Sequence, residues 1–217
     1  MIRSLLSRPS GAAEIAADAV RVLAVIGIVV AGIGWTPVDA LSLAAVAVVM
    51  FLPRLLGLRP SVDIAFGLVA LIAVWSSVLE IYITTRWWDL PVHFAANGLF
   101  AAVFTILLVR ARVVADFRTL PRPMLSAAVT TTAVGMSLGV LWEVFEWYGH
   151  TFLDDEIYVA YVDTIGDLVW GSAGALLAGC LMPFLSGPSP AGAAGALGSA
   201  GAGAPDADDL LPPPELE

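Results

Sequence analysis

The sequence predicts an all-α, polytopic transmembrane bundle of six helices with both termini in the cytoplasm. Of its 217 residues, 59% are hydrophobic and only 13% are charged, whereas a soluble domain has about 25% charged residues. Six apolar runs of roughly 20 residues follow one another, the length that crosses the hydrocarbon core of a bilayer. In such a topology every arginine except Arg86 lies on one side of the membrane, which the positive-inside rule assigns to the cytoplasm.

The apolar runs and the turn residues between them place the six helices. The Thr36–Pro37 step separates the first two, and Gly57 with Pro60 separates the second from the third. The expected helices cover about 17–35, 38–55, 61–84, 91–109, 124–148 and 163–185. Together they form one transmembrane domain, 17–186.

Two segments flank this domain. Arg3 and Arg8 precede a hydrophobic run in a way that resembles a signal peptide, but further spans follow, so we interpret 1–16 as a cytoplasmic segment leading into a retained signal anchor. The Ala/Gly/Pro-rich, acidic tail 187–217 cannot bury enough apolar surface to fold and is expected to be disordered in the cytoplasm. The lone Cys180 excludes an intramolecular disulfide and a cysteine-based zinc site.

Composition also bounds the partners and the location. The chain has no lysine and no basic patch with interleaved aromatic residues, so nucleic acid is not an expected partner. The side opposite the arginines carries the residues expected of an interfacial aromatic belt: Trp35, Trp87, Trp88, Trp147, Tyr148, Tyr158 and Tyr161. These patterns predict a multi-pass protein of the bacterial inner membrane, with the lipid bilayer as its main partner and an unspecified oligomeric state.

Four consecutive predicted helices carry polar groups at the same, extracytoplasmic depth. A charge near the centre of the hydrocarbon costs ~3 kcal/mol, so ionisable residues inside a span suggest a site by default. The candidate binding residues are Glu80, Asp89, His93, Asn97, Glu143, Glu146, Asp163 and Asp167. Each stripe continues as small residues at four-residue steps, such as Gly135 and Gly171, which favours an inward orientation.

Simpler interpretations remain open for several of these residues. Asp89 and Asp163 could act as N-caps of their helices, Asp63 is expected to cap the third helix, and His150 is expected in a solvated loop. Four side chains are hardest to explain in this way, and we expect them to share one pocket: His93, Glu143, Glu146 and Asp167. They are the candidate catalytic residues and also the candidate metal ligands.

The order and spacing of three motifs carry a family resemblance. They are Asp89-xxx-His93-Phe94, Trp142-Glu143-xx-Glu146, and Asp163-Thr164-xx-Asp167 with Gly174-Ala175 downstream. Together they resemble the VanZ-like superfamily, and more closely its YjdF-like branch of bacterial inner-membrane proteins. The resemblance covers a family-like core of about 65–185. It implies a helical membrane fold and a cell-envelope context. Glu146 and Gly171 stand where the VanZ-type pattern usually has Gln and Asn, so a VanZ-specific role is not carried over.

Three functions fit the pocket. The first is the binding of a cation or of a lipid-linked or other cell-envelope ligand. The second is an envelope enzyme that uses a divalent cation, such as Mg²⁺, Mn²⁺ or zinc, or acid/base chemistry. The third is a structural polar network in a partner-binding membrane protein. The sequence favours the first and contains no His-Glu-x-x-His, Gly-x-Ser-x-Gly or Ser-x-x-Lys motif that would identify a reaction.

Overall fold

The computed structural model describes residue 9 and residues 11–155 and 157–187, and all regular structure in these residues is helical. The prediction of an all-α bundle is therefore confirmed. The proposed N-terminal segment 1–16 falls largely, and the proposed tail 187–217 almost entirely, outside the described residues.

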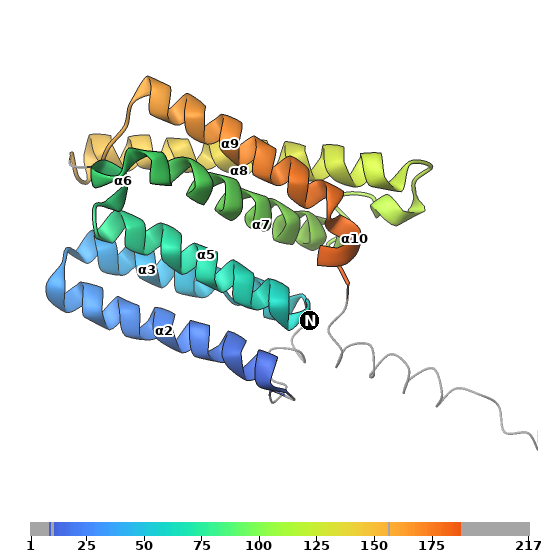
Figure 1. The fold of residues 1–217 in the computed structure, drawn as a ribbon, viewed down its shortest axis with the longest axis horizontal. Helices are drawn as coiled ribbons and strands as arrows, with labels where there is room; N and C mark the ends of the chain where they lie inside the picture. The colour runs from blue at the N-terminus through green and yellow to red at the C-terminus, as the bar shows by residue number, and fades with distance from the viewer. Residues whose placement is uncertain (1–8, 10, 156, 188–217) are drawn as a thin grey trace, which may run out of the picture.

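The described chain folds into six long helices joined by short ones (Figure 1). The long helices are α2 (Ala12–Gly34), α3 (Pro37–Val49), α5 (Pro60–Val78), α7 (Asp89–Arg110), α8 (Pro123–Phe152) and α9 (Tyr161–Cys180). The short helices are α4 (Leu52–Leu55), α6 (Ile81–Thr84), α10 (Met182–Leu185) and the 3₁₀ turns η1 (Arg86–Trp88) and η2 (Phe117–Thr119).

Within the part of the chain that the structure describes, five segments are long and apolar enough to cross a membrane. These segments are Ala12–Gly34, Pro37–Leu55, Pro60–Val78, Arg86–Arg110 and Pro123–Phe152. The sixth predicted span, α9, is present as a helix beside the others but lies outside this set, because Asp163, Asp167 and several glycines lower its apolar content. A helix that packs against protein needs less apolar surface than one that faces lipid.

Local sequence explains where the helices begin. Thr36 and Asp39 form a reciprocal capping box at the start of α3, in which the Asp39 backbone N–H donates to Thr36 Oγ1 at 3.2 Å. Proline occupies the first turn of α5 and of α8. Its fixed φ suits the first helical position, where its missing N–H costs nothing.

Three of the predicted helices are interrupted near one end. The second breaks at Met50–Phe51 and the sixth at Leu181, each followed by a short helix with proline in its first turn. The third breaks at Glu80, which has a left-handed backbone (φ 56°). These breaks turn the chain at the ends of the bundle, whereas the sequence interpretation had continued each helix through them.

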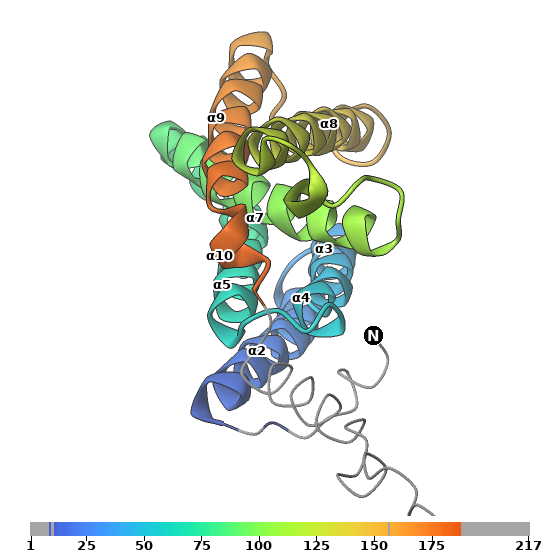
Figure 2. The same cartoon turned by 90° about the vertical axis from the view of Figure 1, so that its right-hand side faces the viewer.

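The long helices form two groups (Figure 2). Helices α2, α3 and α5 pack together at the N-terminal side, and α7, α8 and α9 pack together at the C-terminal side. The main seam between the groups is the contact of α5 with α7, where Phe66 and Phe100 have ring centroids 4.6 Å apart. Figure 2 shows α3 and α8 on the same side of this seam, and these two helices do not pack extensively against each other.

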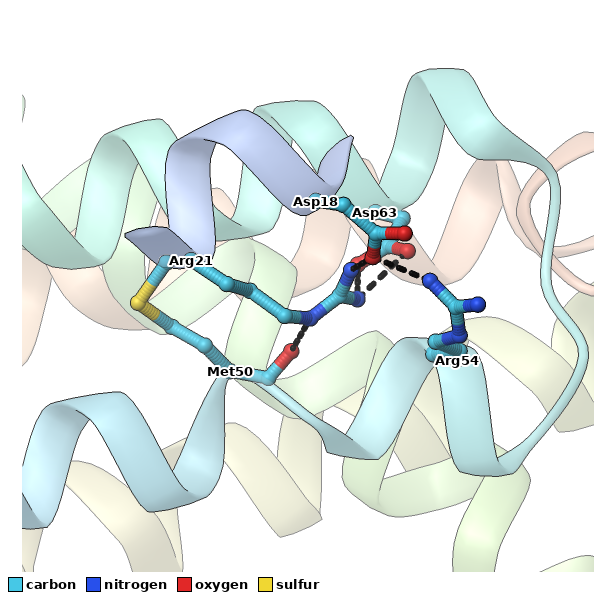
Figure 3. A network of polar contacts seen from close by, with 5 residues as sticks. All are labelled: Asp18, Arg21, Met50, Arg54 and Asp63. Atoms are coloured by element: carbon cyan, nitrogen blue, oxygen red, sulfur yellow. Dashed lines mark hydrogen bonds and ion pairs between the residues drawn. The ribbon is translucent and has the colours of Figure 1, made fainter. Parts of the chain in front are cut away.

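The end of the bundle that holds most of the described arginines carries an ion-pair network (Figure 3). The Arg21 Nη2 atom of α2 lies 2.5 and 2.6 Å from the two carboxylate oxygens of Asp63 on α5, and its Nε donates to the Met50 carbonyl at 3.3 Å. Asp18 accepts from both Arg21 and Arg54. Asp63 is thus an ion-pair partner that joins two helices and not the capping residue that was expected, since the N-cap position belongs to Arg59.

Candidate functional site

At the opposite end of the bundle, helices α7 and α9 bring three ionisable side chains together. His93 Nε2 lies 3.2 Å from Asp89 Oδ1, one turn earlier on α7, and 3.9 Å from Asp167 Oδ1 on α9. The Asp167 side chain is 3% exposed, and its Oδ1 has no hydrogen-bond partner among the described residues. We refer to Asp89, His93 and Asp167 as the triad.

Glycines explain why α7 and α9 approach closely enough to form the triad. A Cβ atom added to Gly174 would lie 1.9 Å from the Phe94 carbonyl oxygen, and one added to Gly98 would lie 2.8 Å from the Gly174 carbonyl oxygen. The two backbones are therefore in direct contact one to two turns below the ionisable side chains. Small residues at helix interfaces permit this distance in membrane bundles.

The same packing confirms the inward orientation predicted for the small-residue stripes. Thr131 and Gly135 of α8, and Gly171, Ala175 and Gly179 of α9, are all buried. A Cβ atom on Gly135 would lie 2.3 Å from the Ala175 Cβ. Of the polar residues that continue these stripes, Asp167 is buried, and Glu143 and Asp163 are partly buried.

Helix α8 adds two carboxylates to this end. Glu143 and Glu146 are both partly buried, and Trp142 Nε1 donates to Glu146 Oε1 at 2.8 Å. This bond positions the Glu146 carboxylate on the inner side of α8 while half of the Trp142 surface stays exposed. Neither glutamate belongs to the group of potential metal-ligating atoms formed by the triad.

A cavity of about 280 Å³ joins the two glutamates to His93 and Asp167 of the triad. It lies among α3, α5, α7 and α8, and most of its lining is apolar, from Val49 and Phe104 in the arginine half to Leu138 and Ala96 nearer the ionisable residues. Phe145, which also lines it, is 68% exposed, so the cavity reaches the lateral surface of the bundle at α8. We call it the lateral cavity, and we call His93, Glu143, Glu146 and Asp167 its polar end.

The remaining predicted binding residues fall in different places. Asn97 lines the lateral cavity and donates from Nδ2 to the Gly135 carbonyl of α8 at 3.1 Å.

Asp163 is partly buried in the first turn of α9, and Asp89 is the first residue of α7. Neither aspartate is an N-cap, because Ala160 and Trp88 hold those positions. Glu80 is exposed at the break after α5 and does not line the cavity.

His150 lies in the last turn of α8, not in a solvated loop as expected. Its Nδ1 is 2.6 Å from the Ile157 carbonyl oxygen, and the side chain is partly buried. Helix α8 runs to Phe152, four residues beyond the predicted end, which carries His150 out of the loop and into the helix.

The sequence interpretation missed Tyr82 as a pocket residue. Tyr82 is on α6, lines the lateral cavity, and donates its hydroxyl to the Ala73 carbonyl at 2.9 Å. Burial raises the pKa of the Tyr82 hydroxyl, and the Asp89 carboxylate acts in the same direction, so the phenol stays protonated at neutral pH. The sequence does not reveal this position of Tyr82, because the helix break at Glu80 that brings α6 over the cavity has no proline or glycine to mark it.

The charge of this end of the bundle is negative. Three carboxylates of the polar end face one imidazole, and Asp89 and Asp163 lie close enough to add their fields. Inside a membrane such a set requires protons, a cation or hydrogen-bond donors to balance it. The site is therefore suited to a positively charged or donor-rich ligand, whereas an isolated anion would be repelled.

A family comparison agrees with the membrane fold. The family model described as "Predicted membrane protein (DUF2238)" matches residues 19–186. The chain belongs to this family. The match of the DUF2238 model begins in α2, so it extends well beyond the 65–185 core that the motifs indicated. No curated protein and no solved structure matches this DUF2238 protein.

Proposed function

We propose that this DUF2238 protein binds an amphiphilic ligand of the bacterial inner membrane. The hydrocarbon part of the ligand lies in the lateral cavity, and its head group meets the polar end. One observation carries the proposal: a single cavity runs from the apolar pair Val49 and Phe104 to Glu143, Glu146 and Asp167. Its volume of about 280 Å³ is near the lower limit of ~300–1,000 Å³ for small-molecule pockets.

The distribution of polar groups favours binding over ion transport. Within the described lining, the ionisable residues gather at one end, and the arginine half is lined by apolar side chains such as Val46, Val49 and Phe104. A pathway for protons or ions needs polar partners along its length. An apolar stretch of this kind suits a lipid chain instead.

The charge of the polar end indicates the class of head group. Because carboxylates outnumber bases there, we infer that the head group carries an ammonium group or several hydrogen-bond donors. The aromatic belt and Glu80 share this end of the bundle, and under the positive-inside rule this end faces away from the cytoplasm. The ligand is accordingly a component of the outer leaflet of the inner membrane.

The test compares lipids that remain bound to the protein in nanodiscs. Phosphatidylethanolamine and phosphatidylglycerol with identical acyl chains are offered together, and the bound lipid is measured by native mass spectrometry. We expect phosphatidylethanolamine to be retained preferentially. Replacing Ala96, which lines the cavity, by tryptophan should abolish retention, whereas Ala45→Trp on the exposed face of α3 should not.

A second comparison separates ligand binding from a structural polar network. Glu146→Gln keeps an oxygen that accepts the Trp142 hydrogen bond but removes the charge. We expect it to lose the preference for phosphatidylethanolamine while the thermal midpoint of the detergent-solubilised protein stays unchanged. Unchanged lipid retention together with a lowered midpoint would favour the structural network. Absence of retained lipid in the unsubstituted protein would refute the proposal.

A further inference from the structure

The triad has the donor atoms and the spacing of a metal site. One imidazole nitrogen and one oxygen from each of Asp89 and Asp167 lie within 4.8 Å of one another. Three ligands bonded at ~2.0–2.2 Å to a tetrahedral Zn²⁺ would be about 3.4 Å apart. The separations of His93 Nε2 from the two carboxylate oxygens, 3.2 and 3.9 Å, bracket this value.

Asp167 supplies an independent indication that a ligand is needed. Its Oδ1 is one of three fully buried side-chain atoms without a hydrogen-bond partner among the described residues, and the other two belong to Thr105 and Thr131. It alone of these is a carboxylate oxygen, and it faces His93 Nε2. A buried carboxylate oxygen with no donor is costly, and a cation bound between it and the imidazole removes that cost.

The scaffold under the triad is rigid enough to hold a coordination geometry. Asp89 and His93 are four residues apart on one face of α7, so their side chains are fixed relative to each other. The contact of Gly174 with the Phe94 backbone fixes the position of α9, and hence of Asp167, along α7. Because the three ligand atoms lie within 4.8 Å of one another, no separation in the triad would have to close by more than roughly 1.4 Å, which rotation of a carboxylate provides.

We propose that Asp89, His93 and Asp167 bind one divalent transition-metal ion, with Zn²⁺ as the best match. An imidazole nitrogen favours Zn²⁺ over Mg²⁺ or Ca²⁺, which prefer oxygen ligands alone. Three protein ligands leave a fourth position open, and because His93 and Asp167 line the lateral cavity, that position faces the cavity. The ion neutralises the two carboxylates. This inference is separate from the amphiphile proposal, since the triad is complete without a lipid.

The alternative occupant of the triad is a proton. A protonated His93 between two carboxylates would balance one of their two negative charges, with the imidazolium Nε2–H shared by Asp89 and Asp167. The two states differ in stoichiometric metal content and in the response to Zn²⁺, so a direct binding measurement separates them.

The experiment uses the full chain, purified without a histidine tag in detergent, stripped with a chelator and then dialysed. The binding of Zn²⁺, Mn²⁺ and Mg²⁺ is measured separately by isothermal titration calorimetry. The amount of bound metal per chain is measured by inductively coupled plasma mass spectrometry. We expect one Zn²⁺ per chain, a raised thermal midpoint with Zn²⁺, and weaker binding of Mn²⁺ than of Zn²⁺. Failure to bind Zn²⁺, or equal binding of Mg²⁺ and Zn²⁺, overturns the assignment.

Substitutions locate the ion. His93→Gln and Asp167→Asn should each abolish the stoichiometric Zn²⁺, and Asp89→Asn provides a third, independent loss if one of these variants fails to fold. Glu80→Gln, an exposed carboxylate at the same end of the bundle, should retain Zn²⁺. Zn²⁺ binding that survives all three triad substitutions overturns the site. Ala96→Trp should keep Zn²⁺ while losing lipid, so the two proposals can fail separately.

Discussion

The backbone of Gly174 on α9 rests directly on the backbone of Phe94 on α7, where a Cβ atom would lie 1.9 Å from the Phe94 carbonyl oxygen. The obstructing atom is part of the main chain, so it cannot move aside as a flexible side chain would. This contact sets the distance between the two helices that carry the triad.

We therefore expect Gly174→Ala to be strongly destabilising. Overpacking in a well-packed interior costs ~1–3 kcal/mol, and here relief requires the helices to separate, so the effect should reach the upper end of that range. The measurement is the free energy of unfolding in mixed micelles. Gly34→Ala is the matched control, because a Cβ there has no neighbour within 4 Å. A neutral Gly174→Ala would contradict the close backbone contact.

The ion pair of Arg21 with Asp63 should contribute strongly to the stability of the N-terminal helices. Its side chains are 7% and 11% exposed, and removing one partner of a buried pair costs ~3–5 kcal/mol. We expect Arg21→Met to cost more than Asp63→Asn, because Arg21 retains Asp18 in the second variant. Thermal unfolding of both single variants measures the difference.

The exposed pair of Arg118 and Asp116, 3.9 Å apart, is the control for this prediction. Substituting Asp116 by asparagine, which leaves the hydrogen bond of Arg118 to Ser186 in place, should change the free energy of unfolding by at most ~1 kcal/mol. The double variant Arg21→Met with Asp63→Leu should be more stable than Arg21→Met alone, since no unpaired carboxylate remains. If the double variant is the least stable of the set, the energetics assigned to the pair are wrong.

Asn97 should act mainly as a link between helices. Its amide donates to the Gly135 carbonyl, and interhelical hydrogen bonds in membranes are worth ~0.6 kcal/mol on average, with a maximum of ~1.7 kcal/mol. We expect Asn97→Ala to lower the unfolding free energy by about this amount and to leave Zn²⁺ stoichiometry unchanged. Loss of the metal in this variant would show that Asn97 belongs to the coordination site.

The orientation of the bundle is open to labelling with cysteine reagents. In a Cys180→Ser background, Glu80→Cys should react in intact cells with a reagent that does not cross the inner membrane, and Arg112→Cys should react only after the membrane is opened. Both positions are exposed, and they lie beyond opposite ends of α7, Glu80 before its first residue Asp89 and Arg112 after its last residue Arg110. The reverse pattern would invert the topology and move the polar end to the cytoplasmic side.

Much of the architecture was predictable because hydrophobic length and arginine distribution act locally. Apolar runs bounded by Pro37, Pro60 and Pro123 marked the beginnings of α3, α5 and α8 within a few residues. The shared depth of the polar residues was also predictable from the sequence. Because successive long helices alternate in direction, the last turn of α8 and the first turns of α7 and α9 lie at one end of the bundle (Figure 1).

The pairing of side chains could not be predicted in this way. Asp63 was expected to serve its own helix, yet its partner Arg21 is 42 residues away. Likewise, the sequence grouped His93 with Glu143, Glu146 and Asp167, whereas the carboxylates that share a group of potential metal ligands with His93 are those of Asp167 and Asp89. The register of α9 along α7 decides this, and that register depends on a backbone contact at Gly174 that no periodicity records.

For the amphiphile that we propose, the place where the lateral cavity reaches the surface, beside Phe145, determines how occupancy is controlled. A ligand that enters through the side of α8 arrives by diffusion within the plane of the bilayer and does not cross an aqueous phase. Occupancy then depends on the mole fraction of the ligand in that leaflet, not on its concentration in the surrounding water. A change in the lipid composition of that leaflet would therefore change the fraction of protein with ligand at the polar end, and no water-soluble signalling molecule would be needed.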